Sequence, residues 1–158
     1  MEHDSTRRML ITAFASLTLG NVSLASATTG TANVQGKSRI LVAYFSRSGN
    51  TRVIAGVIHR SLKTDLFEIE PATPYPEDYF QTVELAKNER TGGIKPALKK
   101  SVADIERYET LYLGFPIWGT SVPPVVQTFL SSHNLAGKLI IPFITHGGYG
   151  KGDSDDIL

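Results

Sequence analysis

From residue 39 onward, short apolar runs alternate with segments whose apolar residues recur at helical spacing. Residues 39–45 are apolar at six of seven positions, as is typical of a strand buried on both faces. Further strands are predicted at 65–70, 110–115 and 138–145, helices at 50–62, 78–90 and 122–132, and a short helical turn at 102–108. This alternation of strands and helices predicts an α/β fold with a doubly wound parallel sheet.

The helical spacing also predicts which side chains face the core. The inward positions that we expect are Val53, Ile54, Val57, Ile58 and Leu62 in the first helix, Phe80, Val83, Leu85 and Ala86 in the second, and Val126, Phe129 and Leu130 in the third. Pro123 and Pro124 suit the first turn of the third helix, where a missing N–H costs little.

The first 27 residues have the pattern of an export signal. Arg7 and Arg8 precede a moderately apolar stretch at 9–24, and residues 25–27 form the small-x-small pattern that signal peptidase accepts. The segment 6–11 resembles a twin-arginine motif, although Thr12 replaces the usual lysine. An ordinary secretory signal or a misassigned start codon is the alternative.

This organisation predicts the location of the protein. We expect residues 1–27 to be a signal peptide, 28–38 a flexible leader and 39–158 the folded domain. The twin-arginine interpretation implies export to the periplasm in folded form, with only transient contact with the membrane during export, and it favours a cofactor that is loaded before export.

Composition limits the chemistry. The chain has 158 residues, a length that suits one domain, and a net charge of +1, which gives no global field to hold nucleic acid. It contains no cysteine, which excludes disulfides, Cys-ligated metal sites and a thiol nucleophile within this chain.

The turn after the first predicted strand is suited to a phosphate group. In such sheets, ligands bind beyond the carboxyl ends of the strands. This turn carries hydroxyl, amide and glycine residues directly before a helix start, namely Ser46, Arg47, Ser48, Gly49, Asn50 and Thr51. A Walker lysine and a GxGxxG sequence are both absent here, so a monophosphate ester is favoured over a nucleoside triphosphate or a dinucleotide. The alternative is an ordinary helix N-cap and turn.

Three motifs in order resemble the flavodoxin family. They are the phosphate loop Ser46, Ser48, Gly49, Asn50 and Thr51, the segment Gly114, Phe115, Pro116, Ile117 and Trp118 after the third strand, and residues 142–148 around the fourth, together with Pro74 and Tyr75 and with Gly137 and Lys138. The resemblance extends from residue 40 to about residue 153. It implies a flavodoxin-like sheet with strand order 2-1-3-4 and flavin mononucleotide (FMN) as cofactor.

Two further loops have the chemistry to enclose a flavin ring. In Pro116, Ile117, Trp118 and Gly119, the tryptophan either contacts the flavin or packs locally, and Gly119 occupies a position where the family often has a second tryptophan. In Thr145, His146, Gly147, Gly148 and Tyr149, the glycines admit backbone donors to the flavin. His146 either donates a proton or makes a structural hydrogen bond, and Tyr149 either stacks on the ring or caps the loop.

The chain also departs from the family pattern. The sequence shows no counterpart of the family's fifth strand and last helices, so we expect either a fragment or a truncated product, and Asp153 resembles the N-cap of an uncompleted helix. The fourth strand is therefore expected to be an edge, and the polypeptide to be poorly stable or prone to aggregation. Electron-carrying flavodoxins are strongly acidic, so the nearly neutral charge argues against a carrier of very low potential.

These features favour an FMN-binding redox protein that transfers electrons to a partner or reduces a small acceptor such as a quinone. The alternative is a flavodoxin-fold binding module without redox activity. A phosphate-ester hydrolase on the same scaffold lacks the expected nucleophile in the first loop.

Overall fold

The computed structural model describes residues 38–158. The predicted signal at 1–27 and all but the last residue of the predicted leader lie outside the described residues. The strands are β1 (Ile40–Tyr44), β2 (Asp65–Glu68), β3 (Thr110–Pro116) and β4 (Leu139–Thr145). The helices are α1 (Asn50–Leu62), α2 (Tyr79–Thr91), α3 (Pro124–Ser132), a short α4 (Ser154–Ile157) and one turn of 3-10 helix at Ile105–Arg107. No helix in this part of the chain is long and apolar enough to cross a membrane.

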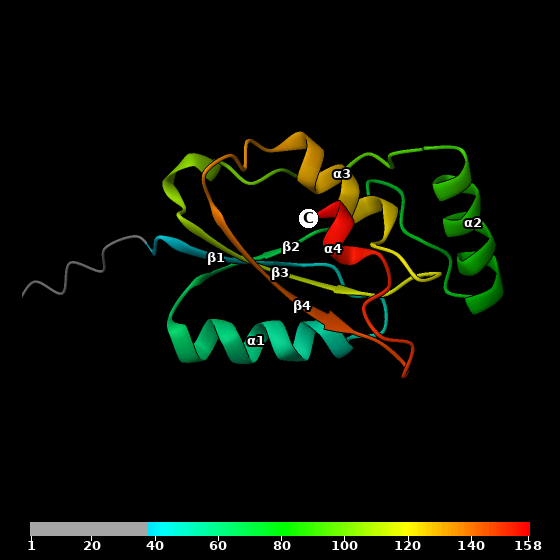
Figure 1. Ribbon diagram of the computed structural model, residues 1–158, viewed down its shortest axis with the longest axis horizontal. Coiled ribbons are helices and arrows are strands. Elements are labelled where there is room, and N and C mark those ends of the chain that lie inside the picture. Colours follow the sequence, from blue (N-terminus) through cyan, green and yellow to red (C-terminus); the bar gives the residue numbers. More distant parts are fainter. Residues whose placement is uncertain (1–37) are drawn as a thin grey trace, which may run out of the picture. The chain divides into compact units, whose positions relative to one another are not determined.

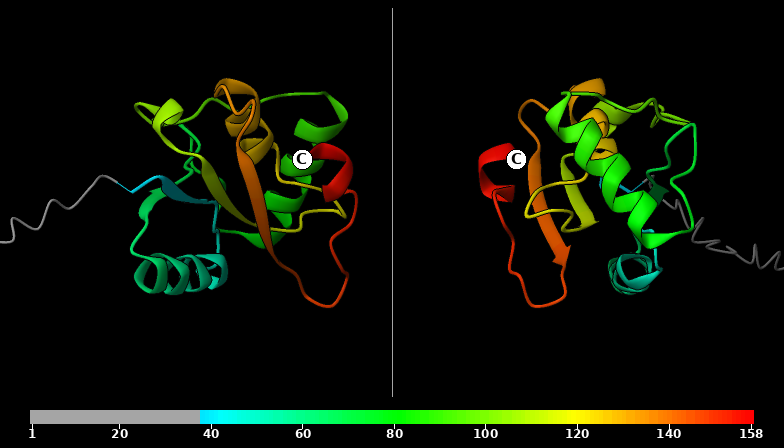
Figure 2. Two further views of the ribbon diagram at one scale, coloured as in Figure 1. Left: turned by 60° about the vertical axis from the view of Figure 1, so that its left-hand side comes forward. Right: turned by 90° about the vertical axis from the view of Figure 1, so that its right-hand side faces the viewer.

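The four described strands form one parallel sheet in the order β2-β1-β3-β4, which confirms the predicted topology. For the majority of the strand and helix ends, the predicted boundary differs from the observed one by one or two residues. Helix α1 lies on one face of the sheet and α3 on the other, while α2 lies beyond the carboxyl ends of the strands and contacts α3 (Figure 1). Figure 2 shows the same arrangement from two further directions.

Side chains from both faces of the sheet form two separate cores. The larger core lies on the α3 side and includes Leu111, Leu113, Phe115, Val126 and Phe129, each at most 1% exposed. The smaller one lies under α1 and contains Val42, Tyr44 and Ala55, with Phe143 packed against it. Because the sheet has a core on each face, β1 and β3 are buried on both faces, and they are apolar at nearly every position for that reason.

The predicted inward faces of α1 and α2 are wrong at most positions. Exposed instead are Val53, Ile54, Val57 and Leu62 of α1, and Phe80, Val83 and Leu85 of α2. Their buried residues are mainly small, namely Thr51 and Ala55 in α1 and Thr82 and Ala86 in α2, with Glu89 as the exception. Small side chains allow the helix backbone to approach its neighbour closely, and this turns the larger apolar residues toward solvent. In α3 the expected Val126 and Phe129 are fully buried.

Strand β4 lies at one end of the described sheet. None of its residues is fully buried, and Leu139 is 59% exposed. Its parallel pairing with β3 nevertheless covers seven residue pairs, from Thr110 with Leu139 to Pro116 with Thr145. Asp153 occupies the N-cap of α4 as expected, although its side chain makes no capping hydrogen bond.

Candidate functional site: a pocket at the carboxyl ends of the strands

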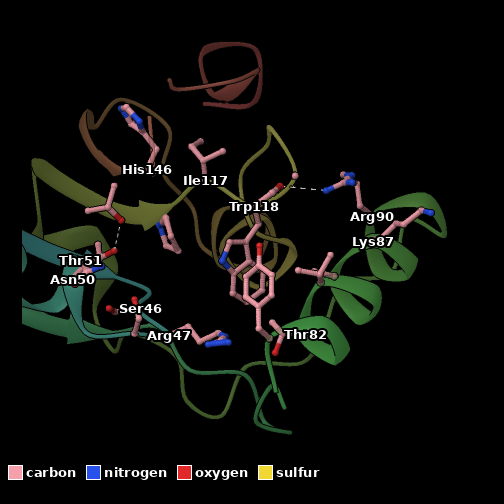
Figure 3. Close-up of a pocket in the computed structure, with 18 residues that line it drawn as sticks. Ser46, Arg47, Asn50, Thr51, Thr82, Lys87, Arg90, Ile117, Trp118 and His146 are labelled. Carbon is pink, nitrogen blue, oxygen red and sulfur yellow. Dashed lines mark hydrogen bonds between the residues drawn. The ribbon is translucent and has the colours of Figure 1, made fainter. Parts of the chain in front are cut away.

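A pocket of about 520 Å³ opens where the loops after β1, β3 and β4 meet (Figure 3). Its volume lies within the range typical of small-molecule sites. Among the predicted site residues it is lined by Ser46, Arg47, Ser48, Asn50, Thr51, Pro116, Ile117, Trp118, Gly119, Thr145, His146 and Gly147. The three loops that the sequence singled out therefore do converge on one cavity.

The loop after β1 leaves the start of α1 open. Gly49 is the N-cap residue, with φ of 90°, and no side chain caps the helix. The N–H of Gly49 donates to Ser46 Oγ at 3.1 Å, and the first helical bond runs from the N–H of Val53 to the carbonyl of Gly49. The amides of residues 50–52 consequently donate to no acceptor among the described residues, and they form the positive end of the helix dipole.

A hydrogen bond joins the β1 and β4 sides of the pocket. Thr51, which is 1% exposed, shares a 2.8 Å hydrogen bond between its hydroxyl and that of Thr145. The carbonyl of Thr145 in turn accepts from the N–H of Ile117 at 2.9 Å. All three loops are therefore connected directly, which holds the pocket's shape.

Arg47 reaches toward α2 rather than toward the start of α1. Its guanidinium lies 6.0 Å from the centre of the Tyr79 ring, within cation–π range, and donates to the carbonyl of Glu77 at 3.5 Å. Its side chain is exposed and lines the pocket between the two elements.

Trp118 both lines the pocket and packs locally. Its ring meets those of Phe45 and Tyr75 edge to face, with centroid distances of 5.2 Å and 4.8 Å. Its backbone pairs with Ser121 through two hydrogen bonds of 3.0 and 3.1 Å. The two alternatives that the sequence left open for this residue are thus compatible, because the packing fixes the ring that the pocket exposes.

A buried carboxyl group supports this aromatic cluster from α2. Tyr75 donates its phenol proton to Glu89 at 2.8 Å, and Glu89 is only 7% exposed. Burial raises the pKa of Glu89, although the hydrogen bond from Tyr75 opposes the shift. Burial, together with the carboxylate of Glu89, also raises the pKa of Tyr75 well above its ordinary range. This pair holds the Tyr75 ring against Trp118.

His146 makes structural hydrogen bonds and still offers a donor. Its Nδ1 atom accepts from the N–H groups of Gly148 and Gly150 at 3.1 and 3.2 Å. A nitrogen that accepts in this way carries no proton, so the neutral ring bears its hydrogen on Nε2. The structure therefore shows the structural hydrogen bond that was one of the two alternatives for His146, and the residue also lines the pocket.

Three predicted site residues do not line the cavity. Gly49 lies within the phosphate loop but contributes only its backbone conformation. Gly148 and Tyr149 are absent from the lining, and the backbone has positive φ at Gly148 and Gly150. Tyr149 is 84% exposed, so of the two alternatives for this residue the structure favours a place on the outside of the loop over a ring in the pocket.

One wall of the pocket, formed by α2, was not predicted from the sequence. Helix α2 contributes Tyr79, Thr82, Val83, Ala86, Lys87 and Arg90. Their spacing of three or four residues places them on one face of the helix. Only that spacing could have indicated a shared face, and it could not have shown that the face lines the pocket.

Arg90 fills the space beside Gly119. Its Nη1 donates to the carbonyl of Trp118 at 3.2 Å, and a Cβ atom added at Gly119 would collide with the guanidinium. The φ of Gly119 is 55°, a conformation that favours glycine. The guanidinium of Arg90, which comes from α2, therefore occupies the space that a side chain at position 119 would enter.

Comparison with known proteins agrees with this arrangement. A family model described as flavodoxin matches residues 39–158. A candidate flavoprotein from Bacteroides uniformis ATCC 8492 has a similar structure, with a TM-score of 0.69 and 32% sequence identity over 75% of this chain and 79% of that one. No curated protein matches the chain.

Two more solved structures have the same fold. A candidate flavoprotein from Bacteroides eggerthii DSM 20697 shares 35% identity, with a TM-score of 0.69 over 76% of this chain and 78% of that one. A flavoprotein from Lactobacillus acidophilus NCFM, solved in complex with FMN, shares 21% identity, with a TM-score of 0.69 over 75% of this chain and 82% of that one. At that identity, the likeness to the third protein concerns the fold alone.

Proposed function

The chain belongs to the flavodoxin family, and on that premise we propose that it binds FMN in this pocket and serves in electron transfer. The observation that carries the proposal is the uncapped start of α1. Free amides at residues 50–52 converge there with the hydroxyls of Ser46 and Ser48, without a carboxylate among the described lining residues. Such a set of donors fits a doubly charged phosphate ester.

The rest of the pocket fits a flat, mainly apolar ring. Ile117 and Trp118 supply an apolar surface beside the phosphate loop. Gly147 lets the backbone approach closely, and the Nε2–H group of His146 can donate to a polar edge. Bound flavin would supply the one- and two-electron chemistry, and the protein would bind, orient and shield it.

The electron acceptor is a partner protein or a small molecule such as a quinone. The opening beside α2, lined by Tyr79 and Val83, is apolar enough to admit a small acceptor next to a bound ring. Two observations support a small acceptor: this opening, and the net charge of +1, which differs from the strongly acidic charge that steers basic protein partners.

FMN titration of the purified protein tests the proposal. We expect Ser48→Glu to raise the Kd for FMN by about 100-fold or more, because placing like charges together costs several kcal/mol. Ser48 is exposed, so the substitution is compatible with the fold. Thr51 is unsuitable for this test because it is buried and bonded to Thr145.

Ser101→Glu is the matched control, since it adds the same charge at an exposed position outside the pocket. Quenching of FMN fluorescence gives the Kd of each variant. Wild-type protein that takes up no FMN, or equal affinities of the two variants, would show that the phosphate does not bind at this loop.

A further inference from the structure

The pocket is lined by more positively charged side chains than the binding of one phosphate group requires. Arg47, Lys87 and Arg90 line it, and among its described lining residues there is neither Asp nor Glu. The phosphate loop already supplies free amides and hydroxyls at the start of α1. In the view of Figure 3, Lys87 and Arg90 lie on the opposite side of the pocket from Ser46, Asn50 and Thr51.

The pocket-facing surface of α2 changes in character along the helix. Its first half presents Tyr79 and Val83, which are 63% and 46% exposed. Its second half presents Lys87 and Arg90, which are both exposed. Since these residues recur every three or four positions, the helix offers an apolar surface that ends in two positive charges.

These two cations are available to a ligand. Neither forms an ion pair with a carboxylate within residues 38–158. The backbone carbonyl of Trp118 holds one nitrogen of Arg90 in place, and the absence of a side chain at Gly119 leaves room for the guanidinium. A guanidinium held in this way retains other N–H groups, and these suit the two oxygens of a carboxylate.

We propose that this face of α2 is a second subsite that binds a small aromatic carboxylate, with the ring against Val83 and the acid group on Lys87 and Arg90. The inference rests on the proposed function, because it names the class of small molecule that would bind beside the flavin. Arginine and lysine together select for the charge of the molecule, and the apolar half of the face selects for its ring.

Benzoate binding to the FMN-loaded full-length protein tests the subsite. The flavin absorbance difference spectrum reports binding without any turnover, and benzamide serves as the uncharged ligand of the same shape. We expect the wild-type protein to bind benzoate more tightly than benzamide. The double variant Lys87→Gln with Arg90→Gln should weaken benzoate binding at least about tenfold, because it removes both positively charged donors to the carboxylate.

A matched double variant controls for the loss of two charges. Arg60→Gln with Lys95→Gln removes the same charges at exposed positions that do not line the pocket, and its affinity for benzoate should stay within about twofold of wild type, since surface charges at a distance are screened. Benzamide affinity should be equal in all three proteins.

Three results would overturn the inference. They are equal affinity for benzoate and benzamide, equal weakening in the two double variants, and unchanged benzoate affinity in the FMN-loaded Lys87→Gln/Arg90→Gln protein. The FMN titration separates this inference from the proposed function. A protein that binds FMN but not benzoate refutes the subsite alone, and one that binds no FMN refutes both.

Discussion

Two glycines allow close contacts in this protein because they have no side chain, and a neighbouring side chain fills the space at each. Gly119 admits the guanidinium of Arg90, and Gly114 of β3 lies beneath the ring of Phe143. Sequence alone showed both glycines but not their neighbours, which come from a different helix and a different strand. The substitution of either glycine therefore tests a tertiary contact rather than a local turn.

Gly114→Ala should destabilise the fold. An added Cβ atom would collide with the Phe143 ring, and such overpacking typically costs about 1–3 kcal/mol. Urea denaturation followed by circular dichroism measures the change. Gly56→Ala in α1 is the control: its nearest neighbour is the flexible end of Arg60, so we expect it to be neutral or to stabilise by up to about 1 kcal/mol. Equal stability of Gly114→Ala and wild type would contradict the packing described for β3.

Glu89 should make stability depend on pH in a defined direction. Because burial raises the pKa of Glu89, the folded state holds this proton more tightly than the unfolded state does. The resulting stabilisation is present below the ordinary carboxyl pKa and is lost as the pH rises through the raised pKa.

Glu89→Gln stays neutral at every pH and its carbonyl can still accept from Tyr75. We expect the free energy of unfolding of wild type, relative to this variant, to fall as the pH rises from acidic to neutral. Urea titrations at several pH values measure it. Tyr75→Phe, which removes the hydrogen bond that lowers the pKa of Glu89, should make the dependence steeper. Parallel curves for wild type and Glu89→Gln would show that Glu89 ionises normally.

At the scale of elements, the two helices around the pocket begin in opposite ways. Helix α1 starts at Gly49 without a side-chain cap, which leaves its amides for a ligand. Helix α2 starts at Asp78, whose carboxylate accepts from the N–H of Gln81 at 2.9 Å. The capped helix supplies a wall of the pocket, and the uncapped helix supplies the proposed anion site.

Asp78→Ala should therefore destabilise α2. The loss of an N-cap costs about 1 kcal/mol, within a range of about 0.5–2 kcal/mol. Hydrogen exchange at the amides of α2 locates the effect, which should concentrate there because Asp78 caps no other element. Asp78→Asn keeps an oxygen acceptor and should restore most of the protection. An unchanged exchange pattern in Asp78→Ala would mean that the cap contributes nothing to the helix.

For the molecule as a whole, apolar side chains remain exposed on the α1 side of the sheet. Val53, Ile54 and Val57 of α1 are 41–68% exposed, and β4 ends the described sheet with Leu139 exposed. Exposed apolar patches and unpaired strand edges both promote association.

We expect a polypeptide of residues 28–158 to self-associate for this reason. Light scattering against concentration measures the association, and Val53→Lys with Val57→Lys should reduce it by placing charges on the patch. Gln81→Lys with Asn88→Lys adds the same charges on exposed positions of α2 and should reduce it less. A monomeric wild type with a cooperative thermal transition would contradict the expectation.

The apolar pattern of the chain was enough to predict the order of strands and helices, because burial on both faces of β1 and β3 leaves continuous apolar runs. Together with the residue types that follow β1, β3 and β4, it was also enough to locate three loops that line one pocket, because parallel strands end at one edge. The resemblance in those loops pointed to the correct family. The predicted export signal lies outside the described residues and stays a prediction.

Only the tertiary structure shows that α2 forms a wall of the pocket. In α2, apolar residues such as Phe80 and Leu85 face solvent, so its pattern misidentified the buried face. The contact between Arg90 and Trp118 joins positions 28 residues apart in two different elements. Local periodicity reports which side of an element is apolar, whereas the charge of the pocket depends on which elements the packing brings together.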